Sequence, residues 1–528
     1  MAFWLNDLSV SVVATSGFLA ILSYLTYRLL IGHLLQFYQL KSIPEVGTSY
    51  PFIGHALILK RNSGDFFCQL VEATDEFRSC PLLKVWLGPV PMLMLYHAET
   101  VEALLNNSVH MDKAHIYSFL HPWLGTGLLT SLTQPKRPRG QTKASTGPKW
   151  RQRRKMLTPT FHFSILLEFL EVMNEQADIL VEKLDREVGE GSFDCFQTIT
   201  LCALDIICET AMGKKMYAQS NSESHYVQSV YKMSDIITRR QKMPWFWWDV
   251  SYNLFGEGLE HNRRLKTLHE VTSNVIRERA DHLRLEEEEE DSDSVPGNGT
   301  RKRRAFLDML LKTEDEGGNK LTHRDIQEEV DTFMFEGHDT TAAAMNWAVH
   351  LLGSHPEVQR KVHLELEEVF GGSKRAITME DLKELKYLDC VIKESLRIFP
   401  SVPFFARTLC DDIVINGFKV PKGANALVLT YALHRDPRYF PNPEEFQPER
   451  FLPENSVGRP PYAYIPFSAG LRNCIGQRFA MMEEKVVLAS ILRSFNIEAC
   501  QKREELHPFA ELILRPSNGI LIKLERRE

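Results

Sequence analysis

Helical spacing of apolar residues dominates the sequence after its first hundred positions. Apolar side chains recur at intervals of three and four residues over three long stretches, which predicts helices: Phe161–Gly213, Asn221–Arg240 and Leu259–Leu285. A hairpin is predicted earlier in the chain, where the short apolar runs Leu82–Leu87 and Met92–Tyr96 are separated by Gly and Pro. The pattern therefore predicts a mainly α fold with a small β region.

One further stretch, His323–Ser354, is free of proline and predicts a single long helix. Thr322 precedes it and Asp325 follows three residues later, the arrangement of a capping box. Pro356 lies just beyond its end. As one helix of about 1.5 Å per residue it would be long enough to cross a whole domain. Gly337, near its middle, costs up to about 1 kcal/mol relative to Ala, so we expect a packing reason for it.

The N-terminal end has a different pattern. Leu8–Tyr27 is uncharged and rich in Leu, Val, Ile and Ala, and as a helix it would span about 30 Å, enough for one membrane crossing. A cleaved signal peptide is the alternative, but no basic residue precedes the run, whereas Arg28 and Lys41 follow it. We therefore predict a retained single-pass transmembrane helix, with the rest of the chain on the cytoplasmic side.

The chain divides into three predicted parts. Residues 1–40 form the anchor, residues 41–56 are a proline-rich hinge, and residues 57–528 form one domain, because the motifs below are scattered but must meet. Two segments without apolar periodicity are predicted surface loops. Residues 131–148 are rich in Lys, Arg, Pro and Gly, for which a nuclear-targeting or nucleic-acid patch is the alternative, and residues 286–304 separate acidic from basic runs.

Composition narrows the possible functions. The 528-residue chain is 44% hydrophobic and 25% charged, so it can bury a large core. Its net charge is −7, which argues against a general polyanion binder, and we expect no nucleic-acid partner. Nine cysteines, an odd number without regular spacing, fit a reducing compartment better than a disulfide framework.

The clearest chemical motif is F-x-x-G-x-R-x-C-x-G, from Phe467 to Gly476. Glycines on both sides of Cys474 allow backbone N–H groups to approach its sulfur, which favours a thiolate. A thiolate needs a compensating cation, and a metal is the better candidate than a disulfide partner. A buried structural cysteine is the alternative for an isolated Cys, but not with the whole motif present.

This motif resembles the haem-binding loop of the cytochromes P450, and the resemblance extends over roughly residues 45 to 525. It implies the P450 fold and assigns Cys474 as the axial thiolate ligand of haem b, iron protoporphyrin IX. Such a ligand pushes electron density onto iron and favours O–O cleavage. Five residues match family positions that surround the haem and bind its propionates. They are Trp150 and Arg154, in the pattern W-x-x-x-R, and Arg407, Phe467 and Arg472. Leu471 departs from the subfamily pattern, which has Pro there.

The resemblance also gives the middle of the long helix a role. Asp339 and Thr340 match the acid and alcohol of the oxygen-binding groove, where the alcohol donates a hydrogen bond and the acid feeds protons inward. A polar helix face is the alternative for the two residues taken alone. Gly337 is expected to allow packing against the flat cofactor.

The run FMFEGHDTTAAA resembles family 4, the fatty-acid hydroxylases, and the V subfamily within it. In that family the Glu at the position of Glu336 can form an ester to a haem methyl, and we take covalent attachment as a hypothesis. Glu394, Arg397 and Arg450 match a structural Glu-Arg-Arg network, and Val402 and Phe404 match substrate-contacting positions. Arg151, Arg153 and Lys155 form either a solvated face or a docking site for an acidic electron donor.

The resemblance implies a monooxygenase of the endoplasmic reticulum membrane that hydroxylates medium- to long-chain fatty acids at or near the omega carbon. It would use O2 and NADPH, with electrons from NADPH-cytochrome P450 reductase, and cytochrome b5 as a second candidate donor, since the chain has no flavin or dinucleotide motif. Two alternatives stay open. One is a haem-thiolate isomerase or dehydratase that needs no reductase, and the other is a membrane-tethered haem-binding protein without turnover.

Overall fold

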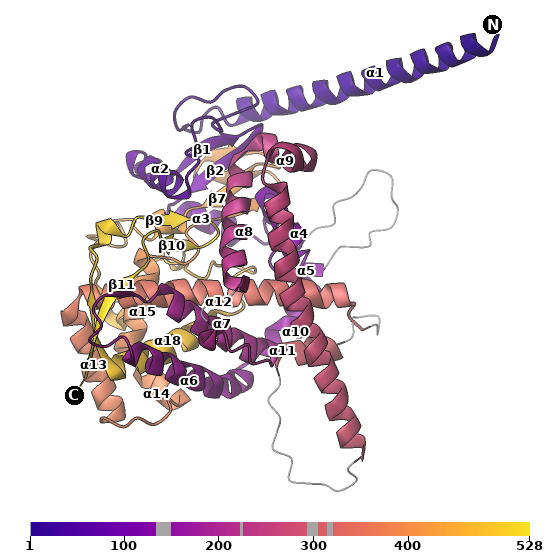
Figure 1. The fold of residues 1–528 in the computed structure, drawn as a ribbon. Helices are drawn as coiled ribbons and strands as arrows, with labels where there is room; N and C mark the ends of the chain where they lie inside the picture. The colour runs from indigo at the N-terminus through magenta and orange to yellow at the C-terminus, as the bar shows by residue number, and fades with distance from the viewer. Residues whose placement is uncertain (1, 134–148, 222–224, 293–304, 314–319, 528) are drawn as a thin grey trace.

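The computed structural model describes the whole chain except residues 1, 134–148, 222–224, 293–304, 314–319 and 528 (Figure 1). Its α-helices are α1 (Ala2–Gln39), α2 (Ser63–Glu76), α3 (Ala98–Leu105), α4 (His121–Leu124), α5 (Lys149–Leu157), α6 (Phe163–Asp185), α7 (Phe196–Met212), α8 (His225–Lys242), α9 (Asp249–Phe255), α10 (Gly258–Ser292), α11 (Phe306–Lys312), α12 (His323–Ser354), α13 (Pro356–Phe370), α14 (Met379–Glu384), α15 (Lys386–Ile398), α16 (Thr430–Leu433), α17 (Pro453–Ser456) and α18 (Gln477–Ser494). Its strands are β1 (Leu82–Leu87), β2 (Val90–Leu95), β3 (Phe193–Asp194), β4 (Phe405–Thr408), β5 (Ile413–Ile415), β6 (Phe418–Val420), β7 (Asn425–Val428), β8 (Phe495–Ala499), β9 (Pro508–Ala510), β10 (Leu514–Pro516) and β11 (Leu521–Arg526).

The predicted fold class holds: the described chain is mainly helical, with four small sheets. The predicted hairpin is β1–β2, which extends into a four-stranded sheet in the order β1-β2-β7-β4, with β2 parallel to β7 and the other pairs antiparallel. The other sheets are β3-β11-β8, β10-β9 and β5-β6. One large apolar cluster fills the helical part, and two smaller ones lie around the four-stranded sheet.

Helix α12 runs through the middle of the helical part and contacts α7, α10, α15 and α18 (Figure 1). It has the bounds that the sequence predicts, and its start is the predicted capping box: the Asp325 N–H donates to Thr322 Oγ1 at 3.1 Å. A Cβ at Gly337 would lie 2.6 Å from Ile207 Cγ1 on α7. Glycine therefore allows α12 to pack closely on α7. Gly337 also lines a cavity at the centre of the molecule, so its contact with a flat cofactor stays a prediction.

Two other expectations about local structure change. The predicted loop at residues 286–304 is wrong at its beginning, because α10 continues to Ser292. Glu is a good helix former, so an acidic run can extend a helix that is already nucleated. Residues 293–304 lie outside the described part, as does the predicted loop 131–148 from residue 134 onward. The predicted helix Phe161–Gly213 is two helices, α6 and α7, separated by β3.

The N-terminal segment is one helix, α1, which projects away from the rest of the molecule (Figure 1). Within the described residues, no single helix has both the length and the apolar character needed to cross a membrane. One pair of helical segments reaches the length and apolar composition of a membrane span only when the two are taken together: Lys149–Phe161 and Phe163–Asp185, which are bent by 61° relative to each other.

Candidate functional site

A cavity at the centre of the molecule is bordered by both predicted motifs. The loop from Phe467 to Gly476 supplies Cys474 to its wall, and α12 supplies Glu336, Gly337, Thr340 and Thr341. Trp150, Arg154, Val402, Phe404, Phe467 and Arg472 also line it, so the fold gathers most of the predicted site residues around one space. We call it the central cavity.

The cysteine loop is held in a conformation that only glycine allows at one point. Gly470 has φ +71°, and a Cβ there would lie 2.2 Å from the Leu105 carbonyl oxygen. The Cys474 N–H donates to the Phe467 carbonyl at 2.9 Å, which closes the loop. The Cys474 thiol is free and accessible to the cavity, but surrounded by protein, and this burial raises its pKa to about 11. The hydrogen bond from the Gly476 N–H partly opposes that rise, and a bound cation would be needed to hold the sulfur as a thiolate.

Cationic side chains gather at one side of the central cavity. Lys113, Arg154 and Arg472 line it, and the buried Arg407 forms a backbone β-bridge with Lys113. The Arg472 guanidinium donates to the carbonyls of Met111, Leu128 and Leu129 at 3.0 to 3.2 Å and lies 5.1 Å from the Trp150 ring.

These cations repel one another. Burial, reinforced by Arg407, lowers the pKa of Arg472 to about 9 and lowers that of Lys113 well below its usual value. Arg407 Nη1 is buried without a hydrogen-bond partner in the described structure. A bound dianion would relieve the repulsion and satisfy this donor, so the cluster is suited to a ligand with carboxylates.

Thr340 and Asp339 lie next to each other on α12 but face different surroundings. Thr340 lines the cavity, its Oγ1 donates to the Glu336 carbonyl at 2.7 Å, and its own carbonyl accepts a hydrogen bond from Ser401 Oγ at 2.8 Å. Asp339 is only 1% exposed, is not part of the cavity wall, and is paired with Arg515. The fold therefore separates the predicted acid from the predicted alcohol.

Glu336 is a carboxyl group on the wall of the central cavity, as expected from its position four residues before Thr340. Burial raises its pKa, and the opposing effect of Lys113 is smaller. A cavity-facing carboxyl group that is costly to ionise is suited to donating a proton or to reacting with a bound group.

Comparison with known proteins decides the family. The family model for cytochrome P450 matches residues 44–524. The chain is 58% identical to "Cytochrome P450 4V2" of Rattus norvegicus over 98% of its length and 96% of that protein, and 59% identical to the Homo sapiens protein of the same name over 93% and 90%. It is 47% identical to "Cytochrome P450 4c3" of Drosophila melanogaster over 90% of its length and 88% of that protein. The chain belongs to cytochrome P450 family 4.

In this P450 monooxygenase, the residues that line the central cavity fit the haem-thiolate cofactor implied by its family. A free thiol on a glycine-bounded loop offers a metal ligand, and the Arg407 Nη1 donor and the neighbouring cations would suit two propionates. Among the residues described, no group of three or more His, Cys, Asp or Glu side chains is arranged to hold a metal ion.

The Glu-Arg-Arg set of this P450 is a contact network between α15 and the segment before the cysteine loop. Glu394 and Arg397 are fully buried and form two hydrogen bonds of 2.7 and 2.8 Å. Arg397 also donates to the carbonyls of His434, Pro443 and Glu445, and Arg450 Nε lies 3.3 Å from Glu394 Oε1. Arg397 thus ties residues 434–445 of the P450 to a core helix.

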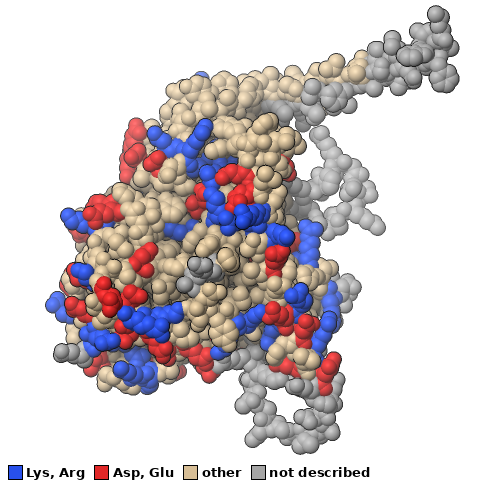
Figure 2. Space-filling view, viewed as in Figure 1, with Lys and Arg blue, Asp and Glu red and all other residues tan. Residues whose placement is uncertain are grey.

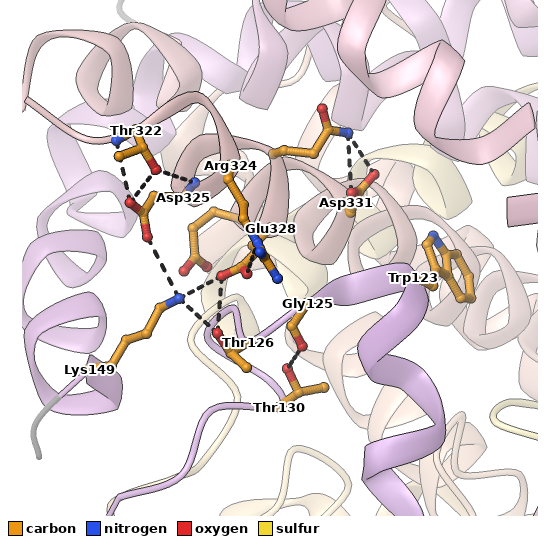
Figure 3. Close-up of polar contacts among 12 residues, drawn as sticks. Trp123, Gly125, Thr126, Thr130, Lys149, Thr322, Arg324, Asp325, Glu328 and Asp331 are labelled. Atoms are coloured by element: carbon orange, nitrogen blue, oxygen red, sulfur yellow. Dashed lines mark hydrogen bonds and ion pairs between the residues drawn. The ribbon is translucent and has the colours of Figure 1, made fainter. Parts of the chain in front are cut away.

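Figure 3 shows how the first turns of α12 fix the start of α5, the helix that carries Trp150 and Arg154 in this P450. Lys149 Nζ lies 2.6 Å from Glu328 Oε2 and 2.8 Å from Thr126 Oγ1. Arg153 is buried against Asp325 and Glu329, which removes it from the proposed donor-docking face, while Arg151 and Lys155 are exposed.

Sequence reasoning missed two kinds of residue in this P450. Lys113 stands alone in HMDKAHIY, where no motif marks it, yet it lies with the cavity cations. Arg515 and Glu511 belong to the β9–β10 region, and the only signal was a charged residue inside the apolar run LILRP. Arg515 pairs with Asp339, which is 176 positions away, and with Glu511 in the turn between β9 and β10. The pairing with Asp339 could not be predicted from the sequence.

Proposed function

We propose that this P450 hydroxylates medium- to long-chain fatty acids at or near the omega carbon. The reaction is RH + O2 + 2 electrons + 2 protons → ROH + H2O, with electrons from NADPH through NADPH-cytochrome P450 reductase, and from cytochrome b5 as a second candidate donor. The observation that carries the proposal is the shared border of Cys474 and the Glu336–Thr341 stretch of α12 on one cavity.

The remaining wall of the cavity suits an acyl chain. Much of it is aliphatic or aromatic, including Leu120, Ile207, Phe333, Phe335, Leu396, Phe405, Leu512 and Ile513, with the candidate contact residues Val402 and Phe404. Each methylene removed from water contributes about 0.8 kcal/mol, so a long chain gains much of its affinity from such a wall. The similarity to the 4V2 relatives supports a family 4 reaction.

Each site residue has a proposed role. Haem, when bound, supplies oxygen activation and electron transfer. Cys474 would be its axial ligand, and Arg154, Arg407, Arg472 and Lys113 would hold its carboxylates, with Trp150 and Phe467 as neighbouring wall. Thr340 can turn its hydroxyl from the Glu336 carbonyl toward the cavity and hold a proton there. Asp339 fixes Arg515 beneath that turn of the helix.

Replacing Thr340 by Ala is expected to uncouple the enzyme, because the cavity then lacks the hydroxyl that positions a proton. Hydroxylated product per NADPH should fall by about tenfold or more, with hydrogen peroxide formed in its place. Product, NADPH and peroxide are measured together. Thr340→Ser keeps the hydroxyl and should remain largely coupled, and a fully coupled Thr340→Ala enzyme would refute the role of this alcohol.

Haem is expected to remain bound to the wild-type protein in acidic butanone if Glu336 forms an ester to a haem methyl. The ester replaces a methyl C–H bond, a two-electron oxidation that turnover with NADPH and O2 supplies. Glu336→Gln should release its haem freely, whereas Glu484→Gln, which alters another cavity carboxylate, should retain it. Mass spectrometry of a haem-linked peptide checks the result, and free extraction from the wild type after turnover excludes the ester.

We also propose a single-pass location in the endoplasmic reticulum membrane, with the catalytic domain on the cytoplasmic side. Large apolar side chains are exposed near the C-terminal end of α1 and on α9: Tyr50, Phe52, Ile53, Val250, Leu254 and Phe255. Phe52 lies near the turn that precedes α9, because the position of a Gly88 Cβ would be within 3.6 Å of both Pro244 and Phe52. This end of the molecule is also poor in charge on the face shown in Figure 2, which fits a membrane-facing surface.

The proposed activity is tested by incubating purified protein, reductase and NADPH with fatty acids of graded chain length, and identifying products by mass spectrometry. Omega-hydroxylated acids formed only with NADPH support the proposal. Product without NADPH would favour the isomerase or dehydratase alternative, and bound haem without any product would favour a non-catalytic haem-binding protein.

A further inference from the structure

A buried cluster of charged side chains connects α12 with β10 and the turn that precedes it. Arg515 on β10 holds two carboxylates: it is paired with Asp339 on α12, and its Nη1 lies 3.2 Å from Glu511 Oε2. Arg515 also lies over the Tyr231 ring at 4.2 Å. Asp339, Arg515 and Glu511 are 1%, 3% and 7% exposed. Burying three charged side chains in a core has a substantial desolvation cost, so we expect a function that explains them.

Glu511 differs from the other two because it borders two separate spaces. It lines the central cavity beside Leu512 and Ile513, and it also lines a cleft on the outside of the protein. We call this the outer cleft; its wall includes Asp235, Arg239, Glu504 and His507, of which the last two are exposed. A carboxyl group in this position has access to water on one side and to the reaction space on the other.

We infer that Glu511 passes protons from the outer cleft into the central cavity, with Arg515 and Asp339 as positioning residues. In each cycle the Glu511 carboxyl group gives its proton to water or to the Thr340 hydroxyl in the central cavity. The resulting carboxylate then takes a proton from water in the outer cleft. Two such transfers balance the two protons that oxygen reduction consumes. The inference rests on the proposed monooxygenase function, and it assigns the acid role to Glu511 because Asp339 does not reach the cavity wall.

The surroundings of Glu511 suit such a relay. Burial raises its pKa to about 7, and Arg515 on β10 is the main opposing influence. From α8, Asp235 raises the pKa and Arg239 lowers it, and Asp339 on α12 raises it. Both protonation states are therefore populated near neutral pH, as a group that repeatedly gains and loses a proton requires. Because the pKa is raised, the protonated donor is lost as pH increases through about 7.

The test compares Glu511→Gln with Glu504→Gln in the full-length, haem-loaded protein with reductase. Glu504 is a matched control, since it is an exposed carboxylate that lines only the outer cleft. Glu511→Gln should lose about tenfold or more of NADPH-driven product and show a larger solvent deuterium isotope effect. Its turnover with hydrogen peroxide, which already carries two electrons and two protons, should stay near the wild-type rate. Glu504→Gln should match the wild type in all three.

A second measurement needs no turnover. Infrared difference spectra of the resting haem protein across neutral pH should contain a carboxyl signal that is present in the wild type and Glu504→Gln, and missing in Glu511→Gln. Equal losses with NADPH and with peroxide, an unchanged isotope effect, or an unchanged infrared signal would each overturn the inference. If the wild type fails to hydroxylate any fatty acid while the infrared signal behaves as expected, the substrate proposal fails and the titration of Glu511 stands.

Discussion

Cys474→Ala is expected to remove all NADPH-dependent product and to abolish the absorption band that thiolate ligation gives to the reduced carbon monoxide complex. The physical reason is that the cavity wall contains one sulfur at the glycine-bounded loop, and alanine provides no ligand for iron. The substitution is small, and the loop hydrogen bond between the residue 474 N–H and the Phe467 carbonyl does not need the side chain. The fold should therefore survive.

The measurement is the spectrum of the reduced carbon monoxide complex, followed by product analysis. Cys500→Ala is the matched control, because Cys500 is also a free, exposed cysteine but does not line the cavity. It should keep the thiolate band and full activity. A thiolate band that persists in Cys474→Ala would show that another residue ligates the iron.

Arg397→Ala is expected to destabilise the domain by roughly 3 to 5 kcal/mol, or to prevent haem-loaded protein from accumulating. Its guanidinium is fully buried and makes hydrogen bonds to the Glu394 carboxylate and to three backbone carbonyls. Removing it takes two hydrogen bonds from the buried Glu394 carboxylate and the Arg397 donor from three backbone carbonyls. Arg397→Lys should rescue little, since an ammonium cannot serve the same planar set of acceptors.

The measurement is denaturant unfolding followed by haem absorption. Arg526→Ala provides the control, because Arg526 forms a comparable two-bond pair with Asp185 at 2.7 and 2.8 Å but is exposed. Water can replace Arg526 as the partner of Asp185 at this exposed position, so the free energy of unfolding should be unchanged within error. Equal stability of Arg397→Ala and the wild type would show that the network is not required for the fold.

Local patterns predicted the parts of this P450 whose causes are local. The bounds and capping box of α12, the β1–β2 hairpin and the position of Cys474 depend on residues within a few positions of each other. Gly470 is an example at a single residue: its left-handed backbone conformation favours glycine, and that glycine is visible in the motif. The family could be identified from the sequence because its motifs are also local, and the match over residues 44–524 confirms it.

Partners distant in the sequence could not be predicted in this way. Asp339 precedes Thr340 in the sequence, but its pairing with Arg515, 176 positions later, could not be predicted, nor that Thr340 lines the cavity while Asp339 does not. Arg153 looked like part of a basic surface, yet Asp325 and Glu329 of α12 bury it. Gly337 was predicted to contact a cofactor, and its close packing against Ile207 of α7 could not be foreseen from the sequence.

By itself, therefore, the sequence determined the helical fold, the iron-ligand candidate and the family, since backbone conformation and motif spacing are properties of neighbouring residues. Only the tertiary structure decided which charges meet: the Lys113, Arg407 and Arg472 cluster, and the carboxylates on Arg515. The reason is physical. The energy of a buried charge depends on desolvation and on the groups that packing brings within a few ångströms, and neither quantity is a function of sequence separation.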